Sequence, residues 1–206
     1  MKRRTLILIL AIVLVFGIAV GGTIAWLIDT TDPVVNTFTV GNIDITLQEH
    51  PLKSGDDYDG MTIDTSAETT DKVDNYKMIP GRTLQKDPFI TVKKDSEECW
   101  LFIRIDKSAN FDTFMEYTVD TTVWNKYTGA QWNGQDIDLW YRQVPAATAD
   151  TDYYILKDNQ VTVKSGVTQA QLQAVGDNKP TLTFIAYACQ SEGLDTYTAA
   201  WQAITR

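Results

Sequence analysis

The sequence predicts an all-β protein, an antiparallel β-sandwich with one or two short helices. Short strand-like stretches recur at near-regular spacing, and Gly, Pro and Asn turn signals separate them. No alternation of strands with long helices, no glycine fingerprint for a nucleotide and no repeat of 20–50 residues is present. Removal of an N-terminal signal of about 25 residues leaves roughly 180, which suits one domain with its own core.

The chain begins with an export signal. Three basic residues precede an apolar run that extends from Leu6 to Val20, which is the pattern of a secretory signal peptide. Thr23 and Ala25 place small side chains at the −3 and −1 positions of a cut that would make Trp26 the first mature residue. We therefore expect a signal helix over residues 1–25 that is cleaved. A weaker cut after Gly21 is one alternative.

Another alternative is an uncleaved membrane anchor, because the mostly apolar stretch from Leu6 to Ile28 is long enough to span a bilayer. We expect contact with a membrane only through this uncleaved signal. After the signal we expect a linking segment over residues 26–36 and a sandwich domain over residues 37–206.

The domain opens with two alternating patterns. Val34–Val40 and Ile43–Leu47 alternate apolar and polar side chains, which is typical of half-buried strands, and Gly41 between them favours a bulge. Residues 50–76 are acidic and poor in large apolar groups, which indicates a long solvated loop. Weak calcium binding by three carboxylates in this loop is the alternative, although their spacing does not fit an EF-hand: Asp56, Asp57 and Asp59.

The remaining strands are predicted from apolar, β-branched and aromatic runs. They cover Pro88–Lys93, Cys99–Asp106, Ile137–Val144, Tyr153–Leu156, Gln160–Lys164 and Pro180–Gln190. The third and fourth are expected to form a hairpin pair. Two helices are expected, one over Thr168–Val175 with Thr168 as its N-cap and one over Asp195–Ile204 capped by Asp195.

Charge excludes two classes of partner. The formal net charge is −9, and removal of the signal takes away three basic residues and no acid, which leaves −12. A nucleic-acid binder needs clustered Lys and Arg, and so does a protein that adheres to anionic lipid. The acidic balance suits a soluble secreted protein.

The two cysteines, Cys99 and Cys189, both lie in apolar strand-like runs. We expect two buried thiols that act as small hydrophobic side chains. A single bridge between strands is the alternative, which an oxidising exterior would permit.

The sequence contains few of the residues and motifs that are typical of a catalytic site. His50 is the only histidine, it lies at a predicted strand-to-loop junction, and we expect it to be exposed. The chain has neither a His-Glu-x-x-His zinc motif nor a Gly-x-Ser-x-Gly elbow. The six Trp and nine Tyr residues are expected in the core and in cross-strand pairs, with a sugar-binding groove as the alternative. We predict that the protein is not an enzyme and needs no cofactor.

Three passages resemble the TasA/camelysin family of Gram-positive bacteria. The most specific is GGTIAWLIDTTDPVVNTFTVGNIDITLQE, where the matching residues are Gly22, Thr23, Ala25, Trp26, Asp29, Asn36, Phe38, Gly41, Ile43 and Ile45. The other two are MIPGRTLQKDPFITVKKDSEECWLFIRI and FIAYACQSEGLDTYTAAWQAI. The middle passage departs from the family at Arg82, where an acid is usual.

This resemblance implies a jelly-roll-like sandwich, export by a dedicated signal peptidase and secretion to the extracellular matrix or cell surface. It also implies a structural subunit or accessory component of an extracellular fibre or biofilm matrix. Its partners would then be other copies of itself or a related fibre subunit. One alternative is a cell-surface metalloendopeptidase of the camelysin kind, and another is a cell-surface module that binds a glycan or a host protein.

The mechanism we predict for assembly is donor-strand exchange. The segment freed by cleavage would add a strand to an open sheet edge of the next subunit, and four of its apolar residues would fill pockets there: Trp26, Ile28, Val34 and Phe38. The alternative is that the segment folds back as the first strand of its own sheet or stays unstructured.

Overall fold

The computed structural model describes residues 28–30, 42–52, 63–66, 68–69 and 76–206. The predicted signal over residues 1–25 lies outside the described residues, as do Trp26, Val34 and Phe38 of the predicted assembly segment. The three loop carboxylates considered for calcium also lie outside them. For residues 28–30 the backbone alone is described.

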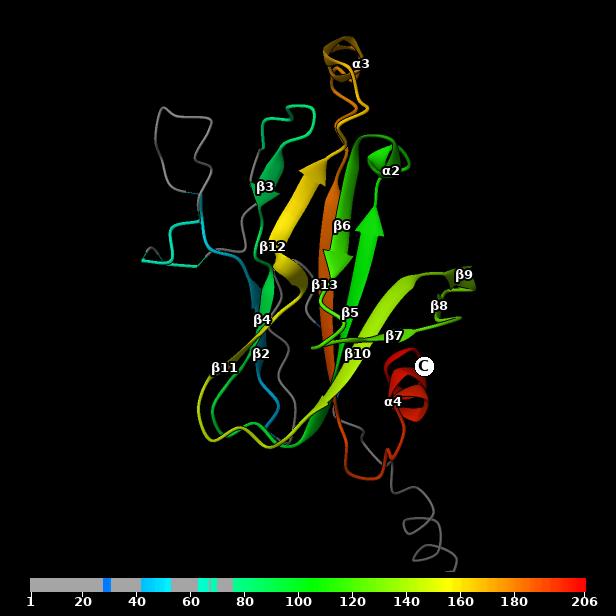
Figure 1. The fold of residues 1–206 in the computed structure, drawn as a ribbon. Coiled ribbons are helices and arrows are strands. Elements are labelled where there is room, and N and C mark those ends of the chain that lie inside the picture. The colour runs from blue at the N-terminus through cyan, green and yellow to red at the C-terminus, as the bar shows by residue number, and fades with distance from the viewer. Residues whose placement is uncertain (1–27, 31–41, 53–62, 67, 70–75) are drawn as a thin grey trace, which may run out of the picture.

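The described chain is mostly β-strand, and every strand pairing is antiparallel, which confirms the all-β prediction (Figure 1). One layer is a five-stranded sheet with the spatial order β1 (Ile28–Thr30), β13 (Leu182–Gln190), β5 (Cys99–Lys107), β10 (Asp138–Val144) and β7 (Asn125–Tyr127). The facing layer consists of two three-stranded sheets. They are β11 (Thr151–Tyr154), β4 (Phe89–Val92) and β2 (Ile45–Gln48), and β3 (Thr83–Gln85), β12 (Leu156–Val163) and β6 (Met115–Val119).

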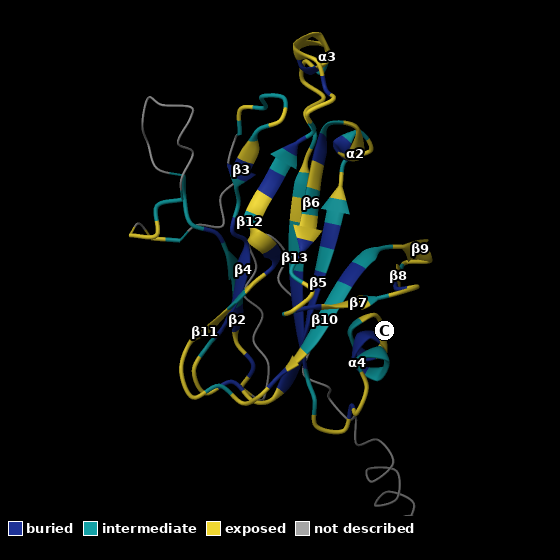
Figure 2. Cartoon of the chain, in the orientation of Figure 1, coloured by how far each residue is buried: buried dark blue, intermediate teal, exposed yellow. Residues whose placement is uncertain are grey.

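The main core lies between these two layers. Leu101 and Ile103 of β5 share one buried cluster with residues of the facing strands, such as Ile90 of β4 and Val163 of β12. More and less exposed positions alternate along β6 and at the end of β12 in the facing layer (Figure 2), because successive side chains of a strand point to opposite faces. The strand β4 and the first half of β5 are buried at every position, which explains why their sequences are mostly apolar, with Thr91 as the one polar residue.

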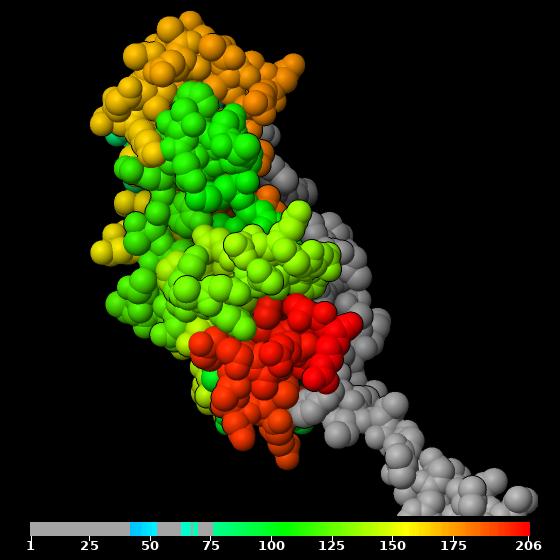
Figure 3. Space-filling model, turned by 90° about the vertical axis from the view of Figure 1, so that its right-hand side faces the viewer, coloured from blue at the N-terminus to red at the C-terminus, as the bar shows by residue number. Residues whose placement is uncertain are grey.

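A second core lies on the outer face of the five-stranded sheet. The helix α4 (Tyr197–Ile204) packs on that face through Trp201, which is 3% exposed. The Trp201 ring centroid lies 5.2 Å from that of Phe102 on β5 and 5.3 Å from that of Tyr187 on β13. At the surface, α4 adjoins the segment that contains the small hairpin β8 (Gln131–Trp132) and β9 (Gln135–Asp136) (Figure 3).

The predicted helices both form, with one correction. The helix α3 (Gln169–Ala174) begins at the expected cap, because the Thr168 hydroxyl accepts from the Gln171 backbone N–H and the Gln171 side chain accepts from the Thr168 backbone N–H. The prediction of Asp195 as the cap of α4 is wrong. Thr196 holds that position, and its hydroxyl accepts from the backbone N–H of Ala199 at 3.2 Å. The short helix α2 (Phe111–Phe114) was not predicted.

The predicted hairpin of Ile137–Val144 with Tyr153–Leu156 is also wrong. β10 pairs with β5 and β7, whereas β11 pairs with β4 in the other layer. Residues 145–150 carry the chain between the layers beside the connection from β4 to β5, with which Ala147 makes two backbone hydrogen bonds of 2.8 Å, to Asp95 and Ser96. Ile155 separates β11 from β12, so the expected fourth strand is divided between two sheets.

Replacement of Trp201 by Ala should lower the free energy of unfolding by about 3–5 kcal/mol, because the indole fills the space between α4 and the sheet. Urea unfolding at neutral pH measures the change. Gln202→Ala, on the exposed face of the same helix, is the matched control and should stay within about 0.5 kcal/mol of the unmodified protein. Equal effects of the two substitutions would contradict a second core under α4.

Candidate functional site

The described part of the predicted assembly segment is an edge strand. β1 pairs antiparallel with β13, and its Cα partners are Ile28 with Cys189, Asp29 with Ala188 and Thr30 with Tyr187. On its other side β13 pairs with β5 along all nine of its residues. β1 therefore covers three of the nine positions of β13, and the structure places it in the sheet of its own domain.

The edge that β1 covers lies between the two cores. Tyr187 and Cys189 of β13 belong to the cluster under α4, whereas Ala186 and Ala188 belong to the cluster between the layers. A strand in this place extends the sheet through backbone hydrogen bonds, which depend little on side-chain identity. The position therefore suits a segment that is held by its main chain.

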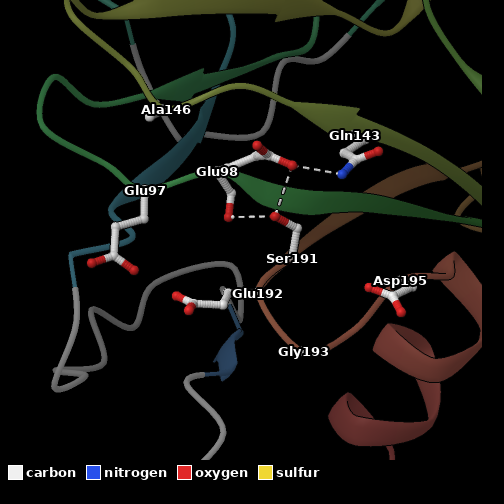
Figure 4. Close-up of a pocket in the computed structure, with 8 residues that line it drawn as sticks. All are labelled: Glu97, Glu98, Gln143, Ala146, Ser191, Glu192, Gly193 and Asp195. Carbon is white, nitrogen blue, oxygen red and sulfur yellow. Dashed lines mark hydrogen bonds between the residues drawn. The ribbon is translucent and has the colours of Figure 1, made fainter.

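Beyond the end of β13 the surface is hollowed (Figure 4). The hollow has a volume of about 630 Å³, and its lining residues are Glu97, Glu98, Gln143, Ala146, Ser191, Glu192, Gly193 and Asp195. The Glu98 carboxylate accepts from the Gln143 amide at 2.7 Å and from the Ser191 hydroxyl at 3.0 Å. Ser191 N–H also donates to the Glu98 carbonyl at 3.0 Å, so these bonds join the end of β13 to the start of β5.

The chemistry of this hollow is that of an acidic surface. Four of its lining residues are carboxylic acids and none is basic. The Ser191 hydroxyl is bonded to a glutamate, and no imidazole lines the hollow. Across the described ranges, no group of three His, Cys, Asp or Glu side chains is placed to hold a metal ion.

His50 corrects another prediction, because its side chain is only 14% exposed. Its ring Nδ1 lies 2.7 Å from Oδ2 of Asp87, and its backbone N–H donates to Oδ1 of the same carboxylate at 3.1 Å. Asp87 is 1% exposed, and such a buried carboxylate is strongly destabilising unless it is bonded in this way. The adjacent pair of Lys86 with Glu49, at 2.6 Å, joins the same two segments. The His50–Asp87 and Lys86–Glu49 pairs therefore connect the residues that follow β2 with the segment between β3 and β4.

The two cysteines are buried and free. Cys99 faces the core between the layers, whereas Cys189 faces the core under α4, so the thiols lie on opposite faces of one sheet. A bridge requires Cβ atoms that point toward each other, and adjacent strands present these two away from each other. Burial raises the pKa of the Cys99 thiol to about 12 and that of the Cys189 thiol to about 11.

No family model, no curated protein and no solved structure matches the chain. In the part of the chain that the structure describes, no helix has the length and apolar character needed to cross a bilayer.

The sequence predicted an assembly segment that includes Ile28, but it did not predict that this segment pairs with β13. The passage Pro180–Gln190 was predicted as a strand, but nothing in its local pattern states which strand lies at its edge. The alternation of small and aromatic side chains at Ala186, Tyr187 and Ala188 is the signal of a strand buried on both faces.

The raised thiol pKa values predict a loss of stability at alkaline pH. The stabilisation is complete below pH 9.0, the ordinary thiol value, and decreases as the pH rises toward about 12, because only the unfolded chain then releases these protons readily. Urea unfolding between pH 7 and pH 11 measures the slope. The double variant Cys99→Ala with Cys189→Ala should show a shallower decline above pH 9, and a slope unchanged from the unmodified protein would contradict the assignment.

Proposed function

We propose that the chain is an exported structural subunit, or an accessory component, of an extracellular fibre, and that subunits join by donor-strand exchange. In this proposal the sandwich is a jelly roll preceded by a signal helix, as the resemblance to the TasA/camelysin family implies. A dedicated signal peptidase would cut between Ala25 and Trp26 and free the segment over residues 26–36. Before the cut this segment would be held at the membrane, so cleavage would start assembly.

The observation that carries the proposal is the three-residue strand β1 at the edge of β13. A strand this short contributes few hydrogen bonds, and each is worth only about 0.5–1.5 kcal/mol net. Its own domain therefore retains it weakly through main-chain pairing. The same segment of a neighbouring subunit offers the same backbone groups and could take the same place on β13.

The geometry of such an exchange leads to open growth. The donor segment lies at the N-terminal end of the chain, and the acceptor is β13 near its C-terminal end. Donor and acceptor are different surfaces, so each contact is head-to-tail and each added subunit presents a new acceptor. Contacts of this kind extend as filaments unless their rotation closes a ring.

Purified mature chain, beginning at Trp26, should form filaments visible by negative-stain electron microscopy. Deletion of Trp26–Val35 should abolish them, because the subunit then has an acceptor without a donor. The matched control keeps the ten residues in scrambled order, and far-ultraviolet circular dichroism verifies that each variant retains its β structure.

The outcomes separate the function from its mechanism. Absence of filaments from the intact mature chain would contradict fibre formation by this subunit alone. Filaments from the deletion variant would still support fibre formation but would refute donor-strand exchange as its mechanism. Capping of growth by an added peptide with the sequence of residues 26–35 would support the exchange directly.

A further inference from the structure

Arg142 lies at one side of the sandwich with its side chain between the layers. It belongs to β10, and its Cα partner on β5 is Leu101, which is fully buried in the main core. Cross-strand partners share a face, so Arg142 points toward the opposite layer. There β11 is the edge strand, and Tyr153 of β11 also faces inward because its partner is the buried Ile90.

Two aromatic rings flank the Arg142 guanidinium. Its Cζ lies 4.2 Å from the ring centroid of Tyr153 and 6.0 Å from that of Trp124. Trp124 is 1% exposed, and its indole N–H donates to the Tyr154 carbonyl at 2.8 Å, which holds the ring in place. A guanidinium favours such ring faces, and the rings fix the plane in which its N–H groups point.

Among the residues that the structure describes, the guanidinium has aromatic neighbours but no hydrogen-bond acceptor. Its Nε is buried and has no hydrogen-bond partner, and none of the described carboxylates lies within 4.0 Å of it. Arg104 on the adjacent strand differs, because its Nη2 lies 2.7 Å from Asp106. Burial lowers the pKa of Arg142, because the guanidinium loses hydration. The two Nη nitrogens are not buried in this way, so their N–H groups reach solvent.

We propose that Arg142 is a binding site for a carboxylate, which the two Nη groups hold end-on beside the rings of Tyr153 and Trp124. A carboxylate is planar and accepts two parallel N–H bonds from a guanidinium. A monoanion also enters the field of a chain with net charge −9 at lower cost than a phosphate dianion does. The carboxylate could belong to a sugar acid or to a peptide, and both supply the same group. The site does not depend on fibre assembly.

Calorimetric titration of the full chain tests the site with two probes, sodium glucuronate and N-acetylaspartate amide. We expect saturable heat from at least one of them, and none from glucose or from sodium chloride at the same ionic strength. Heat from glucuronate alone assigns a sugar acid, heat from the aspartate probe alone assigns a peptide carboxylate, and heat from both shows that the carboxylate is sufficient.

Three variants test whether the heat of binding comes from the Arg142 site. Arg142→Gln should abolish it, and Arg142→Lys should weaken binding at least about tenfold, because an ammonium lacks the planar fork. Arg104→Gln, which removes the ion-paired arginine of the next strand, should leave binding unchanged. Near-ultraviolet circular dichroism verifies that each variant keeps its tertiary packing. Absence of saturable heat with both probes, an equal response to glucose, or binding that survives in Arg142→Gln would overturn the proposal.

Discussion

The structure depends on burial of β5 on both of its faces. Residues Cys99–Lys107 lie in the middle of the five-stranded sheet, between β13 and β10. Leu101 and Ile103 face the sandwich core, while Trp100 and Phe102 face the core under α4. The strand therefore sets the positions of the second layer, the C-terminal helix and β13. Because β13 receives β1, the surface that we propose for assembly is positioned by the same central strand.

Local patterns predicted most of the elements and few of the pairings. The apolar run of β5, the strand at Phe89–Val92 and the Thr168 cap of α3 are readable because each depends on neighbouring residues. The partner of β10 is not readable, since two strands with similar patterns can lie in one sheet or in opposite layers. His50 was misjudged for the same reason, because its acceptor Asp87 lies 37 residues away.

The two candidate sites differ in what a sequence can reveal. The segment that we propose as the donor follows a predicted export signal, so the sequence pattern marks it out, whereas its pairing with β13 uses main-chain groups. The Arg142 site is assembled from three segments, which contribute Trp124, the arginine itself and Tyr153. None of the three is unusual within its own stretch, and only the packing of the two layers shows that the Arg142 Nε is buried with no hydrogen-bond partner among the described residues.

The placement of the two thiols on opposite faces has a consequence for the environment in which the fold can persist. Each sulfur is enclosed by a different core, and the sheet itself separates them. An oxidant outside the molecule meets no exposed thiol, and a reductant meets no disulfide between the two cysteines. Thiol–disulfide chemistry at these two cysteines therefore requires the fold to open first. Neighbouring copies could be crowded together in air without becoming covalently linked through sulfur.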